Sequence, residues 1–212
     1  MDNKKELKID DNQDKSTERL IFQAAKDVFH RKGLAGARMQ EIADEAGINK
    51  AMLHYYFRTK EKLFEAIFNE ECSGFFAKLA ELINVDLPLL DKIEFFVENY
   101  IDLLMKNSYI PVFIISEMHH NPERIKDLFI DRIVSVKHKF LGDITTAVSL
   151  GIIRPIDPRQ LIVNIMALCI FPIAARPMLT FMMEMDDNEY TEFIELRKKE
   201  VSKFIINSIK IN

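Results

Sequence analysis

Apolar residues near the start of the chain repeat with the spacing of a helix. Between Ser16 and Gly33 they recur at intervals of one and three residues, at Leu20, Ile21, Ala24, Ala25, Val28 and Phe29. One apolar stripe of this period predicts an amphipathic helix. We expect Ser16 or Thr17 to cap its start and Gly33 to end it. Residues 1–14 are polar and of mixed charge, and we expect them to form a disordered tail.

Two short helices are predicted next, at about residues 39–46 and 49–56. Gly47 follows the first, as the residue that can adopt a left-handed conformation at a helix end, and Asn49 is expected to cap the second. In the second helix, Leu53 lies on the inward face and Tyr55 on the opposite one. Two short helices joined by the turn Ala-Gly-Ile-Asn are typical of a helix-turn-helix.

The rest of the chain predicts longer helices, at about residues 60–84, 89–106, 111–120, 123–150, 158–171 and 189–209. Asp157 is expected to cap the helix that begins with Pro158. Pro172 and Pro177 are expected to interrupt this same apolar helix. We therefore predict an all-α fold, with a three-helix DNA-binding domain at residues 15–62 and an antiparallel helical bundle at residues 63–212.

The composition supports this fold class. Only 6 Gly and 7 Pro occur in 212 residues, which disfavours β-sandwiches, barrels and glycine-rich doubly wound folds. A hydrophobic fraction of 48% with 29% charged residues is ordinary for a soluble globular protein, and no apolar run is long enough to span a bilayer. Cys72 and Cys169 lack metal-ligand spacing. We expect a cytoplasmic protein with buried thiols and no membrane contact, although a disulfide stays an alternative.

Charge is distributed unevenly along the chain. The net charge is −4, yet residues 1–62 carry 13 Lys and Arg against 11 Asp and Glu. Around the second short helix, four cations (Lys50, Arg58, Lys60, Lys62) face the single anion Glu61. Such a local patch, rather than the total, decides whether a surface can meet phosphate. A solvated helix end is the alternative reading.

Residues 33–63, GLAGARMQEIADEAGINKAMLHYYFRTKEKL, resemble the DNA-binding segment of the tetracycline-repressor (TetR) family. The family pattern is roughly G-Y-x-x-T-T-V-x-x-I-A-x-x-A-G-V-S-x-G-x-L-Y-x-H-F-x-x-K-E-x-L, and residues 19–33 are similar to its first helix. Four departures lie at the predicted DNA surface. Arg38 follows Ala37 where the family has hydroxyl residues, Asn49 replaces a common serine, Ala51 a common glycine, and His54 a common tyrosine. They concern the operator sequence, not the act of DNA binding.

The resemblance implies that the second short helix enters the major groove while its neighbours hold phosphates. Lys50, Met52, His54 and Tyr55 would lie at or near base edges, and Tyr56 and Lys60 would contact phosphate. Lys60 could instead be a solvated lysine at a helix end. The predicted DNA-binding residues are Arg38, Asn49, Lys50, Ala51, Met52, His54, Tyr55, Tyr56 and Lys60.

The resemblance further implies a dimer that senses a small molecule. Tyr100, Phe113, Met118 and Phe140 are predicted ligand contacts from position and chemistry, with core packing as the alternative. Apolar stripes on the last two helices predict a dimer interface at Leu161, Ile165, Leu168, Phe193, Leu196, Phe204 and Ile205. These stripes could also pack only within their own subunit.

We therefore expect a dimeric repressor that a small apolar or amphipathic ligand releases from a pseudo-palindromic operator. An activator, a ligand-independent DNA-binding protein, and a helical-bundle enzyme or carrier are the alternatives. Glu117, His119, His120, Glu123 and His138 lack the repeated carboxylate–histidine spacing of a di-metal bundle. No nucleophile or phosphate-loop motif occurs, so we expect no metal, no cofactor and no enzymatic activity.

Overall fold

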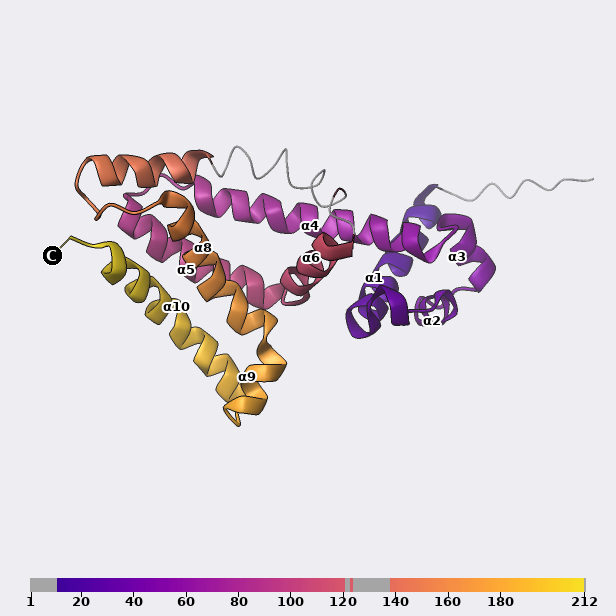
Figure 1. Ribbon diagram of the computed structural model, residues 1–212. Helices are drawn as coiled ribbons and strands as arrows, with labels where there is room; N and C mark the ends of the chain where they lie inside the picture. Colours follow the sequence, from indigo (N-terminus) through magenta and orange to yellow (C-terminus); the bar gives the residue numbers. More distant parts are fainter. Residues whose placement is uncertain (1–10, 121–122, 124–137, 212) are drawn as a thin grey trace, which may run out of the picture. The chain divides into compact units, whose positions relative to one another are not determined.

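The computed structural model describes residues 11–120, 123 and 138–211 (Figure 1). Its helices are α1 (Asp11–Gly36), α2 (Met39–Glu45), α3 (Lys50–Tyr56), α4 (Lys60–Asn84), α5 (Leu89–Lys106), α6 (Tyr109–His120), α8 (Pro158–Ala174), α9 (Arg176–Met182) and α10 (Asp187–Ile209). Residues 138–149 are also helical, whereas the first part of the helix predicted at 123–150 lies largely outside the described residues. The all-α prediction is confirmed.

The chain divides into two compact units within α4, one ending at Glu71 and the other beginning at Cys72. This division falls further along α4 than the boundary expected after residue 62. The first unit is built around a small core of fully buried side chains: Ile21, Ala25, Val28, Ile42, Ala43, Leu53 and Leu63.

The first helix differs from its prediction at both ends. It begins at Asp11 rather than Ser16, so residues 11–14 are helical and not part of a disordered tail. Helical backbone also resumes after Gly33 and continues to Gly36. Gly33 still interrupts the helix, because its φ of 65° and ψ of 176° are not helical. A glycine suits this kink, since φ is positive there.

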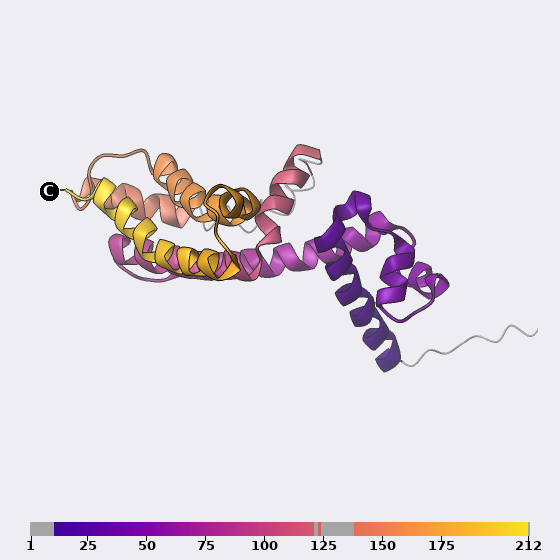
Figure 2. The same cartoon turned by 90° about the horizontal axis from the view of Figure 1, so that it is seen from below.

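The second unit is organised around α5, which packs against α8 and α10. Figures 1 and 2 show α8 and α10 side by side. Nine residues of α5 are buried, and one of them is a lysine. Lys92 is 2% exposed, and its ammonium group donates to the carboxylate of Asp143 in the 138–149 helix. This pairing supplies the counter-charge that a buried cation requires.

Pro172 does not interrupt its helix, contrary to the expectation. It lies inside α8, which begins as predicted with Asp157 accepting from the Arg159 amide at 2.9 Å. The break falls at Ala175, and α8 and α9 meet at a bend of 71°. Two side chains of α10 reach the end of α8. Arg197 donates to the Leu168 carbonyl at 3.0 Å and Tyr190 to the Pro172 carbonyl at 3.1 Å.

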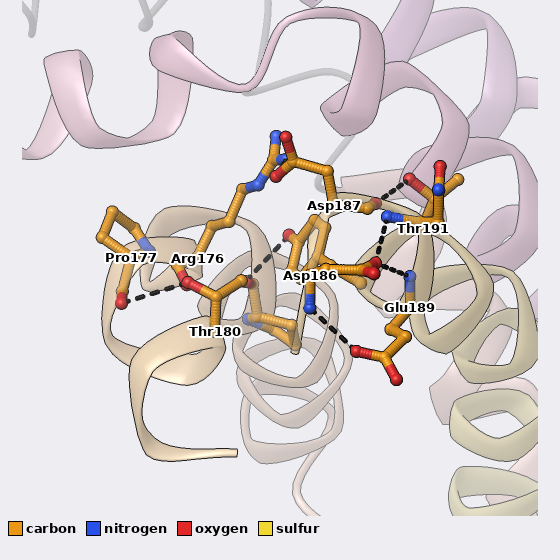
Figure 3. Close-up of polar contacts among 10 residues, drawn as sticks. Arg176, Pro177, Thr180, Asp186, Asp187, Glu189 and Thr191 are labelled. Carbon is orange, nitrogen blue, oxygen red and sulfur yellow. Dashed lines mark hydrogen bonds and ion pairs between the residues drawn. The ribbon is translucent and has the colours of Figure 1, made fainter. Parts of the chain in front are cut away.

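The corner between α9 and α10 is held by a capping box (Figure 3). Asp186 accepts hydrogen bonds from the amides of Asn188 and Glu189, and the Glu189 carboxylate accepts from the Asp186 amide at 2.8 Å. Arg176 of α9 pairs with Asp187 at 2.8 Å. These contacts start α10 two residues earlier than predicted.

Among the described residues, no single helix is long and apolar enough to cross a membrane. Helices α8 and α9 reach that length and composition only as a bent pair.

Candidate nucleic-acid interface and ligand cavity

The exposed face of α3 carries most of the predicted base contacts. Leu53 is fully buried beneath this helix, whereas Tyr55 is 71% exposed. Lys50, Ala51 and His54 are exposed as well, and Met52 and Tyr56 are half-buried. The tyrosine rings of positions 55 and 56 pack edge to face, with their centroids 5.5 Å apart. The helix therefore presents cationic, imidazole and phenol groups together within two turns.

Local contacts fix the start of this helix as the sequence predicted. The Asn49 side chain accepts a hydrogen bond from the Met52 amide at 2.8 Å. Gly47 has a φ of 68°, so the turn uses the left-handed conformation expected of it. The Arg38 side chain, in contrast, makes no cap at α2, in line with the absence of a hydroxyl residue there. Arg38 is exposed.

An ion-pair cluster joins the end of α1 to α2. Arg31 donates to both carboxylate oxygens of Glu45, at 3.1 and 2.6 Å, and Lys32 lies 2.7 Å from Glu41. The hydrogen bonds from Arg31 lower the pKa of Glu45 below its usual value. These are surface pairs, which contribute little energy each, but their geometry sets the position of α2 against α1.

The ammonium group of Lys60 forms a hydrogen bond within the protein. It donates to the carbonyl oxygen of Ala37 at 3.0 Å, so the start of α4 is tied to the segment before α2. Two N–H groups of this ammonium remain for another acceptor. At the same helix start, the Thr59 hydroxyl accepts from the Lys62 amide at 3.2 Å.

Sequence reasoning did not assign two exposed cations beside this helix start. Arg58 and Lys62 are both exposed, and with Tyr55, Tyr56 and Phe57 they line one open surface depression. The signal was present in the local charge count, which included both residues without giving them a role.

Comparison with known proteins agrees with this geometry. Residues 21–67, which run from the middle of α1 into the first turns of α4, match the family model described as "Bacterial regulatory proteins, tetR family". This part of the chain is thus a DNA-binding segment of the TetR family. This TetR-family protein is thus a DNA-binding transcriptional regulator and not an enzyme.

Related proteins match the TetR-family chain over different lengths. The transcriptional regulator RutR of Escherichia coli O157:H7 is 28% identical over 149 residues, which are 70% of each chain. RutR of Escherichia coli K12 is 40% identical over 52 residues, or 24% of each chain. The identity is therefore higher over the shorter match.

Solved structures share the fold over nearly the whole chain. The fatty acid degradation regulator FadR of Bacillus halodurans superposes with a TM-score of 0.62 at 17% identity, covering 89% of this chain and 94% of that one. FadR of Bacillus subtilis, solved in complex with stearoyl-CoA, gives a TM-score of 0.58 at 16% identity and covers 89% and 97%. At such identities the likeness concerns the fold alone.

A small apolar cavity of about 50 Å³ lies in the second unit. Its walls come from α4, α5, the 138–149 helix and α8, through Leu79, Ile83, Phe96, Tyr100, Phe140, Ile162, Ile165 and Met166. Of the four predicted ligand contacts, Tyr100 and Phe140 line this cavity. Phe113 and Met118 lie on α6 and do not, and Met118 is 52% exposed.

The polar groups near this cavity are few. Tyr100 is 2% exposed, and burial raises the pKa of its hydroxyl above the usual value. Burial also raises the pKa of the nearby Cys169 thiol to about 12. Both groups are therefore neutral at physiological pH.

The predicted dimer residues separate into two groups. Leu161, Ile165 and Ile205 are at most 2% exposed and pack inside their own subunit, which is the alternative that the sequence left open for these stripes. Leu168 and Phe193 are half-buried. Leu196 and Phe204 are each 66% exposed on α10. Helix α8 is apolar on most sides, and its exposed apolar residues are instead Val163, Met166 and Phe171.

Proposed function

We propose that this TetR-family regulator is a dimeric repressor that binds a pseudo-palindromic operator and leaves it when an apolar or amphipathic ligand binds. The observation that carries this proposal is the exposed face of α3. It presents Lys50, His54 and Tyr55 on a helix whose start is capped by Asn49 and whose inner side is anchored by Leu53. This geometry suits a helix in the major groove.

Basic groups around α3 supply the phosphate contacts of this proposal. Lys60, Arg58 and Lys62 lie at the loop before α4 and at its first turn. We add Arg58 and Lys62 to the predicted phosphate contacts, because both are exposed and line the depression beside Tyr55, which also holds the carboxylate of Glu65. Phosphate contacts of this kind give affinity and register rather than sequence preference.

Dimerisation is supported by the exposed apolar residues of α8 and α10. Leu196 and Phe204 on α10, together with Val163 and Phe171 on α8, are each more than half exposed. One helix of seven residues covers few base pairs, and a two-fold dimer doubles the site that is read.

We expect Leu196→Glu and Phe204→Glu to produce monomers in sedimentation. Leu150→Glu, at an apolar residue 69% exposed in the turn after residues 138–149, is the matched control and stays dimeric.

The cavity supports a ligand with an apolar body. Its lining is aliphatic and aromatic, but about 50 Å³ is far below the roughly 300–1,000 Å³ of ordinary ligand pockets. An acyl chain, the apolar part of the stearoyl-CoA bound by FadR of Bacillus subtilis, would have to push the walls apart. Leu79 and Ile83 belong to α4, the helix that begins at Lys60. A ligand that moves these walls therefore acts on the helix next to the DNA-binding surface, and only differential affinity for two conformations can produce release.

Selection of bound duplexes from a random pool tests the proposed function directly. We expect recovery of a two-fold symmetric site, retained by the wild-type chain and lost when Lys50 and Tyr55 are both changed to alanine. Acyl-CoA and free fatty acids of graded chain length are then added to the complex, and release is followed by gel shift. Recovery of no preferred sequence, or of a site bound equally well by the double variant, would contradict this reading of α3.

An activator remains the second candidate. A reporter fused to the selected site separates the two, because a repressor lowers its expression and an activator raises it.

A further inference from the structure

One side chain on the exposed face of α3 is held by a contact within the protein. The Nδ1 atom of His54 lies 3.2 Å from the carbonyl oxygen of Arg58, in the loop between α3 and α4. A carbonyl oxygen only accepts hydrogen bonds, so Nδ1 must carry the proton. This contact therefore fixes the orientation of the ring and, in the neutral imidazole, places the proton on Nδ1.

The other ring nitrogen of His54 is left without a protein partner. The side chain is exposed, and no described residue forms a hydrogen bond or ion pair with Nε2. In a neutral imidazole whose Nδ1 carries the proton, Nε2 is an acceptor and cannot donate. Lys50 and Tyr55 on the same face can both donate, so Nε2 adds an acceptor beside them.

We propose that His54 is a base-reading acceptor, whose Nε2 accepts a hydrogen bond from an exocyclic amino group in the major groove. This inference rests on the proposed placement of α3 in that groove. Two bases present such a donor there, adenine through N6 and cytosine through N4. Guanine and thymine present the acceptors O6, N7 and O4 at the corresponding edge, and phosphate oxygens are acceptors too. His54 therefore selects for a base with an amino group and contributes little to phosphate binding.

Two conservative variants of His54 distinguish a contact with a base from a purely structural contact with the Arg58 carbonyl. Asparagine places a side-chain amide near the position of Nδ1, so His54→Asn keeps a donor to the Arg58 carbonyl but has no group at the position of Nε2. Glutamine reaches the position of Nε2, so His54→Gln keeps an acceptor for the base but not the tie to Arg58. A merely structural histidine would be better replaced by asparagine, and a base-reading one by glutamine.

The experiment uses the full chain and the duplex recovered by selection. In each half-site, single amino groups are removed in turn, by purine in place of adenine and by pyrimidin-2-one in place of cytosine. At one position we expect wild-type affinity to fall by roughly threefold to tenfold, the loss of one hydrogen bond. His54→Asn should bind the intact and the altered duplex equally, whereas His54→Gln should retain part of the difference. Whether the sensitive position is adenine or cytosine identifies the base.

Two results would overturn the role of His54. One is that removal of any amino group lowers the affinity of the wild type no more than that of His54→Asn. If a palindrome is still bound in that case, the proposed function stays intact. The other is that the sensitive position prefers guanine, which would make Nε2 a donor. Failure to recover any preferred duplex would remove the proposed function and the role of His54 together. If His54→Asn folds poorly, His54→Gln provides the comparison with the wild type, since it should retain part of the difference.

Discussion

The guanidinium of Arg197 donates a hydrogen bond to the carbonyl oxygen of Leu168, with Nη2 and the oxygen 3.0 Å apart. In an uninterrupted helix this carbonyl would accept from the amide four residues later. That residue is Pro172, which has no N–H. A side chain of α10 thus replaces the backbone donor that α8 lacks. Burial lowers the pKa of Arg197 below its usual value, but the group stays charged at physiological pH.

The first prediction concerns this substitute donor. Replacement of Arg197 by methionine leaves the Leu168 carbonyl without a partner in the protein, and we expect a loss of about 1–3 kcal/mol in the free energy of unfolding. Urea unfolding followed by far-UV circular dichroism measures it.

The control is the same change in a Pro172→Ala background. Alanine restores an N–H that can serve Leu168, so Arg197→Met should cost less there. An equal cost in both backgrounds would show that Arg197 stabilises the bundle by packing alone.

The second prediction concerns the cap of α3. Asn49→Ala removes the acceptor for the Met52 amide, and we expect a loss of about 1 kcal/mol in stability. Asn49→Asp keeps the cap but adds a negative charge at the DNA surface. It should therefore retain stability while binding the operator more weakly, with the deficit growing at low salt. Thermal unfolding and gel shifts at several salt concentrations give the two readouts. Equal stability of the alanine and aspartate variants would contradict the role of the cap.

The third prediction concerns the buried lysine. Asp143→Ala removes the counter-charge of Lys92, a residue that is 2% exposed. We expect a loss of about 1.5–3 kcal/mol, the range for hydrogen bonds to charged groups. The double variant Lys92→Met/Asp143→Leu should recover most of this loss, because an apolar pair needs no desolvation of charge. If the double variant is as unstable as Asp143→Ala, the pair does not act through its charges.

The fourth prediction concerns pH. Burial raises the pKa of Cys169 from 9.0 to about 12, so the native state holds this proton more tightly than the unfolded chain. The resulting stability is fully present below about pH 9 and is lost as the pH rises towards 12. Urea midpoints measured between these limits should fall with pH, and the fall should be shallower in Cys169→Ala. A thiol reagent at pH 8 should label Cys169 only after unfolding. Rapid labelling of the native protein would contradict this burial.

Much of the DNA-binding unit could be predicted because its signals are local. Asn49, Gly47 and Leu53 act on residues within one turn of themselves, and their spacing alone defines the turn and the inward face. Asp157 and Pro158 marked the start of α8 for the same reason. The capping box at Asp186 and Glu189 carries an equally local signature, Asp-x-x-Glu, which sequence reasoning overlooked.

Other features depend on contacts between distant segments. Pro172 was expected to bend its helix, but Arg197 serves the Leu168 carbonyl, which the proline leaves without its backbone donor. The buried face of α8 could not be chosen from its sequence, because apolar residues surround the helix and periodicity does not separate Ile165 from Val163. The contact between His54 and Arg58 depends on the path of a loop, which spacing does not give.

The hydrogen bonds from α10 to α8 join residues that are synthesised at different times. Leu168 and Pro172 leave the ribosome before Tyr190 and Arg197, so the end of α8 is made before its side-chain donors exist. Until α10 has been made, neither the Leu168 nor the Pro172 carbonyl has its side-chain donor. The second unit therefore completes these two hydrogen bonds only when nearly the whole chain has been synthesised.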